Sequence, residues 1–284
     1  MKKVILLLVC SLIFTGCLKR DNMEDIDIYT TAYPIEYITS VLYGEHSNVY
    51  SIYPDGVNIF DYSLTDKQIA DYSSSSLFIF NGLSEEKDYV ADMFSYNGNL
   101  KIINVGESME INYSVEELWL EPSNFLMIAQ NIRNGFDEYI ENTYLKNEIE
   151  ENYETLKLEM SNLDAKLKLL VSESSRNTII ASDDLFKYLE KYGFNVISLD
   201  EDSITDKILY DATTLLNSGE VTYIFTKKNE DLSDTVASLI DDGIGEIAEF
   251  NTLTNLTETQ RNNKDTYITI MNENIELLRL ELYQ

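Results

Sequence analysis

Short apolar runs alternate with amphipathic segments along most of the chain. Runs of four or five residues rich in Ile, Val, Phe and Tyr are typical of buried strands, whereas the segments between them repeat their apolar positions every three or four residues, as helices do. Such alternation predicts a parallel sheet flanked by helices. In the first half the predicted strands are Ile26–Thr30, Val49–Tyr53, Leu77–Phe80 and Lys101–Val105, and the predicted helices lie near Pro34–Tyr43, Thr65–Tyr72 and Glu85–Tyr96, with a further helix start at Pro122.

The middle of the chain lacks any strand pattern. From Leu145 to Leu170 apolar residues recur at spacings of four or three, with Lys and Glu on the other faces. This predicts one long helix with a narrow apolar seam, about 39 Å in length. A dimeric coiled coil would show the same seam. The alternation resumes directly afterwards, which favours a helix that packs within its own chain.

The second half repeats the organisation of the first. We therefore expect an α/β protein of two lobes, each a parallel sheet flanked by helices, joined by one long rigid helix. The predicted ranges are 26–144 for the first lobe, 145–171 for the linking helix and 172–284 for the second lobe. The second-half strands are predicted at Asn177–Ala181, Phe194–Ser198, Val221–Phe225 and Glu246–Phe250, and the helices near Asp184–Tyr192, Ile204–Asn217, Leu232–Asp241 and Glu258–Leu282.

The N-terminus has the order of a secretory leader. Lys2 and Lys3 precede the apolar run Val4–Phe14, which is too short to span a bilayer as a mature helix. The run ends in Thr15-Gly16-Cys17, which resembles the lipobox of bacterial lipoproteins, where the cysteine is lipidated and becomes the first mature residue. We predict a signal peptide over 1–16, a lipidated tether over 17–25 and a position on the outer face of the bacterial cytoplasmic membrane. An ordinary secreted protein cleaved nearby is the alternative.

Charge and composition narrow the function classes. The formal charge is −29, and loss of Lys2 and Lys3 with the leader lowers it to −31, so the chain repels nucleic acid and attracts cations without selectivity. With Cys10 removed and Cys17 lipidated, no thiol remains for disulfides, catalysis or metal. The one histidine, His46, lies in a polar stretch, and the motifs of nucleotide-binding and serine-hydrolase enzymes are absent. We therefore expect a non-enzymatic protein.

The predicted topology places particular loops at a binding cleft. Open parallel sheets bind ligands beyond the carboxyl ends of their strands, and two facing lobes would bring such loops together. Pattern alone thus predicts a binding protein without naming its ligand. The loops are Thr30–Pro34, Pro54–Tyr62, Gly106–Glu121, Ser182–Asp184 and Asn251–Leu253.

Several motifs at these loops recur in one order and spacing. Tyr53–Leu83 combines a Pro and Gly loop, an Asp-Tyr segment, a helix and a strand that ends in Asn-Gly, and Glu117–Asn124 carries Trp-Leu-Glu-Pro. Together with Tyr29–Ile38, Ile179–Ile197 and the long helix, they resemble the metal-receptor lipoproteins of zinc and manganese ABC importers over nearly the whole mature chain. The resemblance implies a monomer that delivers a divalent cation, zinc or manganese, to an ABC permease.

The metal-ligand positions of that family hold unusual residues here. The family usually has histidines at its first two positions, His or Glu at the third and Asp or Glu at the fourth. Carried over, these positions fall on Phe60, Glu117, Asp183 and Asn251. Phe60 coordinates nothing, whereas the other three supply oxygens, which suit harder ions better than zinc. Asp61, Glu116 and Asp184 are sequence neighbours of these positions beside the expected cleft, and they would replace the ligands only if their loops were re-aimed.

Three functions stay open at this point. The first is a receptor for a divalent cation with an altered site. The second is a receptor whose ligand is now an organic cation, and the third is a surface scaffold of the same fold without a ligand. Phe60 beside carboxylates would suit an organic amine through cation–π and ion-pair contacts. The fold by itself does not choose among the three.

Overall fold

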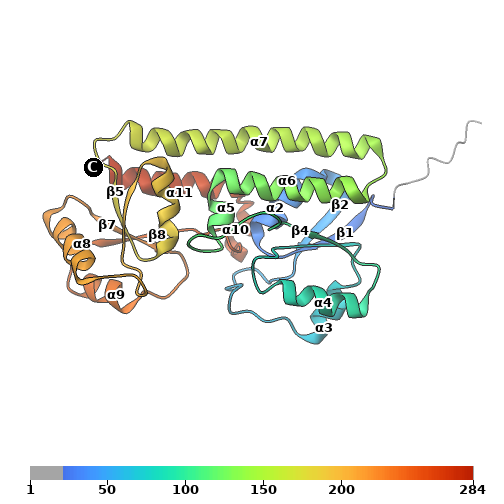
Figure 1. The fold of residues 1–284 in the computed structure, drawn as a ribbon, viewed down its shortest axis with the longest axis horizontal. Coiled ribbons are helices and arrows are strands. Elements are labelled where there is room, and N and C mark those ends of the chain that lie inside the picture. The colour runs from blue at the N-terminus through green and yellow to red at the C-terminus, as the bar shows by residue number, and fades with distance from the viewer. Residues whose placement is uncertain (1–21, 284) are drawn as a thin grey trace, which may run out of the picture.

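The computed structural model describes residues 22–283, so the predicted signal peptide and Cys17 lie outside the described residues. The chain forms two lobes, each built on a four-stranded parallel sheet, and the long helix α7 runs along one side of both (Figure 1). This confirms the predicted α/β architecture. Of the helices in residues 22–283, none combines the length and apolar character needed to cross a membrane.

The first lobe has its sheet in the order β2-β1-β3-β4, with Ile28 of the central strand β1 paired to Val49 on one side and Leu77 on the other. Leu77–Phe80 is buried along its whole length because the parallel sheet is covered on both faces. The strands are β1 (Ile26–Thr30), β2 (Ser47–Ser51), β3 (Leu77–Phe80) and β4 (Lys101–Asn104), and the helices are α2 (Tyr33–Tyr43), α3 (Asp66–Tyr72), α4 (Lys87–Tyr96), α5 (Glu117–Leu120) and α6 (Pro122–Tyr139), with a short 3₁₀ turn at Gly44–His46.

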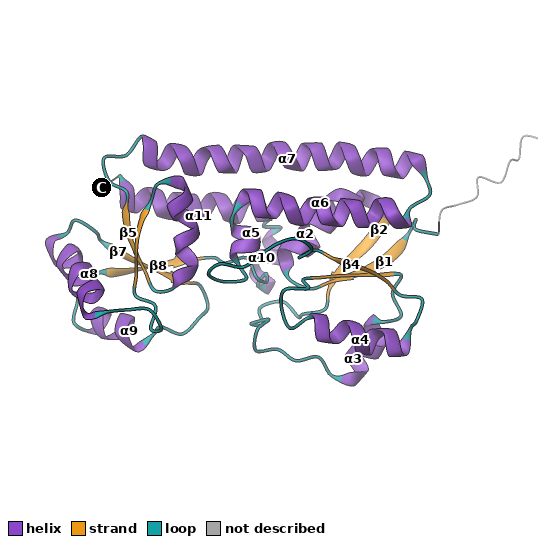
Figure 2. Cartoon of the chain, in the orientation of Figure 1, coloured by secondary structure: helices purple, strands orange, loops and turns teal. Residues whose placement is uncertain are grey.

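The second lobe is again a sheet flanked by helices (Figure 2). Its strand order is β6-β5-β7-β8. Its strands are β5 (Thr178–Ala181), β6 (Asn195–Ser198), β7 (Tyr223–Lys227) and β8 (Glu246–Phe250). A 3₁₀ helix spans Asp184–Tyr192, and the α-helices are α8 (Asp206–Ser218), α9 (Asp234–Asp241), α10 (Glu258–Asn263) and α11 (Tyr267–Leu282).

Helix α7 (Thr143–Ser172) joins the lobes as predicted, beginning two residues before the predicted range and ending one after it. It packs against α2 and α6 of the first lobe and α11 of the second. Because one side contacts helices and the other faces water, only a narrow stripe is apolar. The buried stripe consists of the residues that define the seam in the sequence: Leu145, Ile149, Tyr153, Leu156, Met160, Leu163, Leu167 and Leu170.

The structure differs from the sequence prediction most clearly in two strands, one helix and the tether. Strand β2 begins two residues earlier than predicted and β7 two residues later, because pairing with the neighbouring strands β1 and β8 sets their register. The predicted helix Glu258–Leu282 is two helices, since Lys264 adopts a left-handed conformation (φ +61°) that ends α10. Met23, inside the predicted tether, is fully buried in the core.

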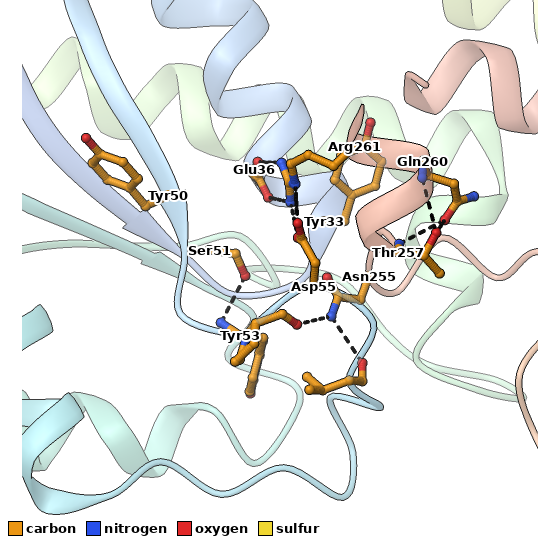
Figure 3. Close-up of polar contacts among 12 residues, drawn as sticks. Tyr33, Glu36, Tyr50, Ser51, Tyr53, Asp55, Asn255, Thr257, Gln260 and Arg261 are labelled. Carbon is orange, nitrogen blue, oxygen red and sulfur yellow. Dashed lines mark hydrogen bonds and ion pairs between the residues drawn. The ribbon is translucent and has the colours of Figure 1, made fainter. Parts of the chain in front are cut away.

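The lobes contact each other through the loop between β8 and α10. Asn255 Nδ2 donates hydrogen bonds to the carbonyls of Pro54 and Val57 in the first lobe. Arg261 holds Glu36 and Asp55, with its Nη1 2.6 Å from Glu36 Oε1 and its Nη2 2.8 Å from Asp55 Oδ1 (Figure 3). These contacts hold the two lobes together next to the loops that follow the strands.

Candidate solute-binding sites

The four positions assigned by the metal-receptor resemblance lie in loops or at helix ends beyond the strands. The polar side chains among them already make hydrogen bonds or ion pairs with other residues. In residues 22–283 there is no group of three or more His, Cys, Asp or Glu arranged to hold a metal ion. Each position has a local reason for this.

Glu117 is buried, and its carboxylate accepts hydrogen bonds from the loop that precedes it. Its Oε1 accepts hydrogen bonds from the Asn112 amide at 2.6 Å and from Asn112 Nδ2 at 3.1 Å, while Oε2 accepts one from the Tyr113 amide at 2.9 Å. A carboxylate that accepts several amide hydrogen bonds is already well solvated by the protein. Glu117 therefore stabilises the loop that leads into α5.

Asn251 closes a turn after β8. Its side-chain oxygen accepts a hydrogen bond from the Leu253 amide at 2.9 Å, and its backbone is paired to the side chain of Asn274. It also lines a small polar crevice of about 60 Å³ between the lobes, with Gly56, Val57 and Asn58 on the opposite side.

The two flanking aspartates are likewise held locally. Asp61 is exposed and accepts a hydrogen bond from Asn58. Asp184 lies 2.6 Å from Lys187 Nζ and accepts a hydrogen bond from Ser203. Partial burial opposes its ionisation, but the contacts with Lys187, Ser198 and Ser203 prevail and lower the pKa of Asp184.

Asp183, the third assigned position, belongs to an ion-pair cluster centred on a lysine. Lys227 Nζ lies 3.1 Å from Asp183 Oδ2, 3.0 Å from Glu230 Oε2 and 3.8 Å from Glu116 Oε1. Glu116 comes from α5's N-terminus in the first lobe, whereas the other members come from the second lobe. The ammonium group therefore lies between the lobes, where three carboxylates share it; we call these four side chains the Lys227 cluster.

Burial sets the electrostatics of the Lys227 cluster. Lys227 is only 17% exposed and Glu116 2%. Burial raises the pKa of Glu116, and the ammonium of Lys227 opposes this only partly. Burial alone would lower the pKa of Lys227, but the surrounding Glu116, Asp183 and Glu230 raise it above its usual value. The lysine therefore carries its charge throughout the neutral range.

Phe60, the first assigned position, lies in a different place. It lines a pocket of about 310 Å³ in the first lobe, together with Tyr53, Tyr62, Tyr89 and the buried Glu86. Phe60 itself is 47% exposed. The four assigned positions thus lie apart: Phe60 in this pocket, Asn251 at the small crevice, Asp183 in the Lys227 cluster and Glu117 on the loop before α5.

Lys227, Glu230 and Glu86 were not identified as site residues from the sequence. Lys227 ends β7, so the strand-end rule applied to that strand would have found it. Glu86 follows β3 by six residues and nothing in its local pattern distinguishes it from the other acids of so acidic a chain.

Two α/β lobes joined by a long helix and closed around polar strand-end loops define a two-lobed solute-binding protein. The family model described as "Zinc-uptake complex component A periplasmic" matches residues 28–280, and the chain belongs to this family. Its members are the solute-binding proteins of metal ABC importers, of the zinc, manganese and iron type, and they are not enzymes.

Individual relatives are distant. The zinc-binding lipoprotein AdcA of Streptococcus pneumoniae is 21% identical over 310 residues, which cover 98% of this chain and 61% of AdcA. The iron-binding protein YfeA of Yersinia pestis is 27% identical over 207 residues, covering 66% of this chain and 65% of YfeA, so the chain spans less than two thirds of either relative. The Zn(II)-bound ZnuA-like domain of AdcA shares the fold, with a TM-score of 0.74 at 20% identity over 92% of this chain and all of that domain.

Proposed function

We propose that this chain is the extracytoplasmic solute-binding component of an ABC importer in which a lysine ammonium replaces the divalent cation between the lobes. The observation that carries the proposal is the position of Lys227 Nζ between Glu116 of one lobe and Asp183 and Glu230 of the other. A divalent ion brought to this place would meet a fixed positive charge, and it would have to displace the ammonium from all three carboxylates.

The donor set supports the same conclusion. Zinc sites favour nitrogen or sulfur among their ligands, and no histidine or cysteine belongs to the Lys227 cluster. The alternative is a hard-ion site made of Glu117, Asp183 and Asn251, as the family positions imply. For that site Glu117 must release the Asn112 and Tyr113 amides, Asp183 must release Lys227, and Asn251 must release the Leu253 amide.

Removing the ammonium group tests the proposal directly. Lys227→Met keeps an unbranched side chain, one atom shorter and uncharged, and leaves Glu116, Asp183 and Glu230 without their cation. We expect calorimetric titrations of the apo protein with Mn²⁺ and Zn²⁺ to show binding by Lys227→Met that is at least about ten-fold tighter than by the wild type, because an entering ion no longer competes with the ammonium for three carboxylates.

Lys228→Met is the matched control. Lys228 is the next residue along the chain and takes no part in the Lys227 cluster, so its replacement should leave the titrations unchanged. Nanomolar binding of either metal by the wild type, with no gain in Lys227→Met, would show that the ammonium does not occupy the cation's place. The site would then have to be sought at Glu117, Asp183 and Asn251.

Attachment to the membrane and docking to a permease complete the proposal. The relatives include lipoproteins, and the Thr15-Gly16-Cys17 sequence supports lipidation at Cys17. We expect Cys17→Ser to accumulate as an unprocessed precursor without lipid, as detected by metabolic labelling with palmitate. Normal processing of Cys17→Ser, together with release of the wild type by a salt wash, would exclude the anchor.

A further inference from the structure

The pocket that contains Phe60 lies at the carboxyl ends of two strands in the first lobe. Tyr53 follows β2, whereas Glu85 and Glu86 follow β3. Open parallel sheets bind their ligands at this edge. The volume of about 310 Å³ is at the lower end of the range for small-molecule sites. Position and size together are those of a site for a small solute, separate from the Lys227 cluster.

Aromatic rings form most of the walls, and hydrogen bonds hold several of them in place. The rings of Tyr53 and Tyr62 pack edge to face, with centroids 5.9 Å apart. Gln68 Nε2 donates to the Tyr62 hydroxyl at 2.9 Å, and the Leu64 amide donates to the Tyr89 hydroxyl at 3.3 Å. These rings are therefore positioned before any ligand arrives. Phe60, which is half exposed, also lines the pocket.

The base of the pocket carries a carboxyl group that lacks a cation. Glu86 is 7% exposed, and its Oε2 accepts hydrogen bonds from Ser84 Oγ at 2.9 Å and from the Asn81 amide at 3.3 Å. No Lys, Arg or His lines the pocket, whose other acid is Glu85. Buried carboxylates in proteins are normally paired with a cation. Burial raises the pKa of Glu86 to about 7, although hydrogen bonds from Ser84, Thr31, Asn81 and Tyr53 act in the opposite direction, and no basic group is among its neighbours.

We propose that this pocket binds a small organic ammonium ion, whose positive charge pairs with Glu86 and whose alkyl groups contact the rings of Tyr53, Phe60, Tyr62 and Tyr89. Aromatic faces attract alkylated ammonium ions through the ring quadrupole, and several rings around one carboxylate are typical of such sites. A metal ion fits the same walls poorly, because carbon faces supply no ligand atoms and the described residues offer no group of three metal-binding side chains there.

Choline is a suitable probe because it has an uncharged isostere, 3,3-dimethylbutan-1-ol, of nearly the same shape. Isothermal titration of the purified full chain in detergent should show saturable binding of choline. The isostere should bind at least about ten-fold more weakly, since it lacks the charge that Glu86 and the rings attract. Tetramethylammonium and ethylammonium, titrated in parallel, test whether the site prefers quaternary or primary ammonium ions.

Two variants with matched controls identify the site. Glu86→Gln and Phe60→Ala should each weaken choline binding by about ten-fold or more. The controls are Glu281→Gln, a buried acid of the second lobe that accepts hydrogen bonds from the Thr222 and Tyr223 amides, and Phe94→Ala, an exposed Phe of α4 outside the pocket. Both controls should bind choline as the wild type does, and circular dichroism should show that all four variants are folded.

Several results would overturn the proposal. They are equal binding of choline and its isostere, equal losses in the variants and their controls, and absence of binding by all three ammonium ions at millimolar concentration. The outcome is independent of the metal titrations, because Lys227 does not line this pocket. Lys227→Met should therefore bind choline with unchanged affinity whether or not it gains affinity for a metal.

Discussion

Two carboxyl groups at the carboxyl ends of strands show how differently the same residue type is used in this protein. Glu116 and Glu86 are both buried, at 1% and 7% exposure, and burial raises the pKa of each. Glu116 has the Lys227 ammonium 3.8 Å away, whereas the pocket of Glu86 contains no basic side chain. The first carboxylate has a cation of the chain beside it, whereas the second has none and is neutralised either by a proton or by a cation that enters the pocket.

This difference explains why the family resemblance and the local chemistry point to different places. The resemblance leads to the space between the lobes, where Lys227 already lies among three carboxylates. The buried acid that has no basic neighbour is Glu86, in the first-lobe pocket that Phe60 also lines. At the position to which the resemblance assigns a metal ligand, this chain thus has an aromatic ring that forms part of a neighbouring pocket.

The largest expected effect on stability concerns Glu116, the buried acid that has Lys227 beside it. Lys227→Met should lower the free energy of unfolding by about 3 kcal/mol at pH 7, because Glu116 then stays buried without its cation. In this variant the pKa of Glu116 rises further, so the penalty should fall toward zero as the pH drops below 4.5 and the carboxyl takes up its proton. Urea unfolding at pH 7 and pH 4 measures both values.

Lys228→Met should change stability by less than about 0.5 kcal/mol, as is usual for a surface substitution. The double variant Lys227→Met with Glu116→Gln should recover part of the lost stability. Equal loss in Lys227→Met at both pH values would mean that the lysine acts by packing, and the contrast with Glu86 would then disappear.

Glu86, the buried acid without a basic neighbour, should make the stability of the protein depend on pH in a defined direction. The pKa of Glu86 is raised from 4.5 in the unfolded chain to about 7 in the fold, so its stabilising contribution is complete below pH 4.5 and is lost as the pH rises through 7. Glu86→Gln has no such proton to lose. It should therefore gain stability over the wild type between pH 5 and pH 8 by on the order of 3 kcal/mol, at about 1.4 kcal/mol per pKa unit.

Thermal unfolding of the ligand-free protein across that pH range measures this gain. The other titratable groups that line the pocket are Glu85, Tyr53, Tyr62 and Tyr89. Burial raises the pKa of Tyr53 further above the neutral range, so that phenol does not titrate in this window. A stability difference that is the same at pH 5 and pH 8 would contradict the assignment of a high pKa to Glu86.

Glu36 is a third buried acid, and the loss of its basic partner Arg261 should have a smaller effect on the free energy of unfolding. Glu36 is 8% exposed and is held by Arg261, which also binds Asp55 across the lobe interface. Arg261→Ala should lower the free energy of unfolding by about 2 kcal/mol, less than Lys227→Met because the guanidinium is partly exposed to water. Arg279→Ala, which removes an exposed ion pair to Glu276 within α11, is the control and should cost less than about 0.5 kcal/mol.

The sequence determined the elements and much of their arrangement. Short runs rich in apolar residues identified all eight strands of the described residues, most directly β3, whose unbroken apolar run is buried on both faces. The seam of α7 was readable residue by residue, since a helix that packs on one side only must repeat its apolar positions every three or four residues. The errors were shifts of two residues in β2 and β7 and the break at Lys264, where pairing with neighbours and a single left-handed residue decide the boundary.

Only the tertiary structure decided which charges meet. Composition shows an excess of acids, but it does not show that Glu116 shares Lys227 with Asp183, or that Glu86 is enclosed by Tyr53, Tyr62 and Tyr89. Local pattern reports whether a side chain faces the core or water, because that depends on its own element. The partner of a buried charge lies on another element, sometimes in another lobe, and its distance is set by how the sheets and helices pack. The chemistry of both sites is therefore a property of the packed molecule.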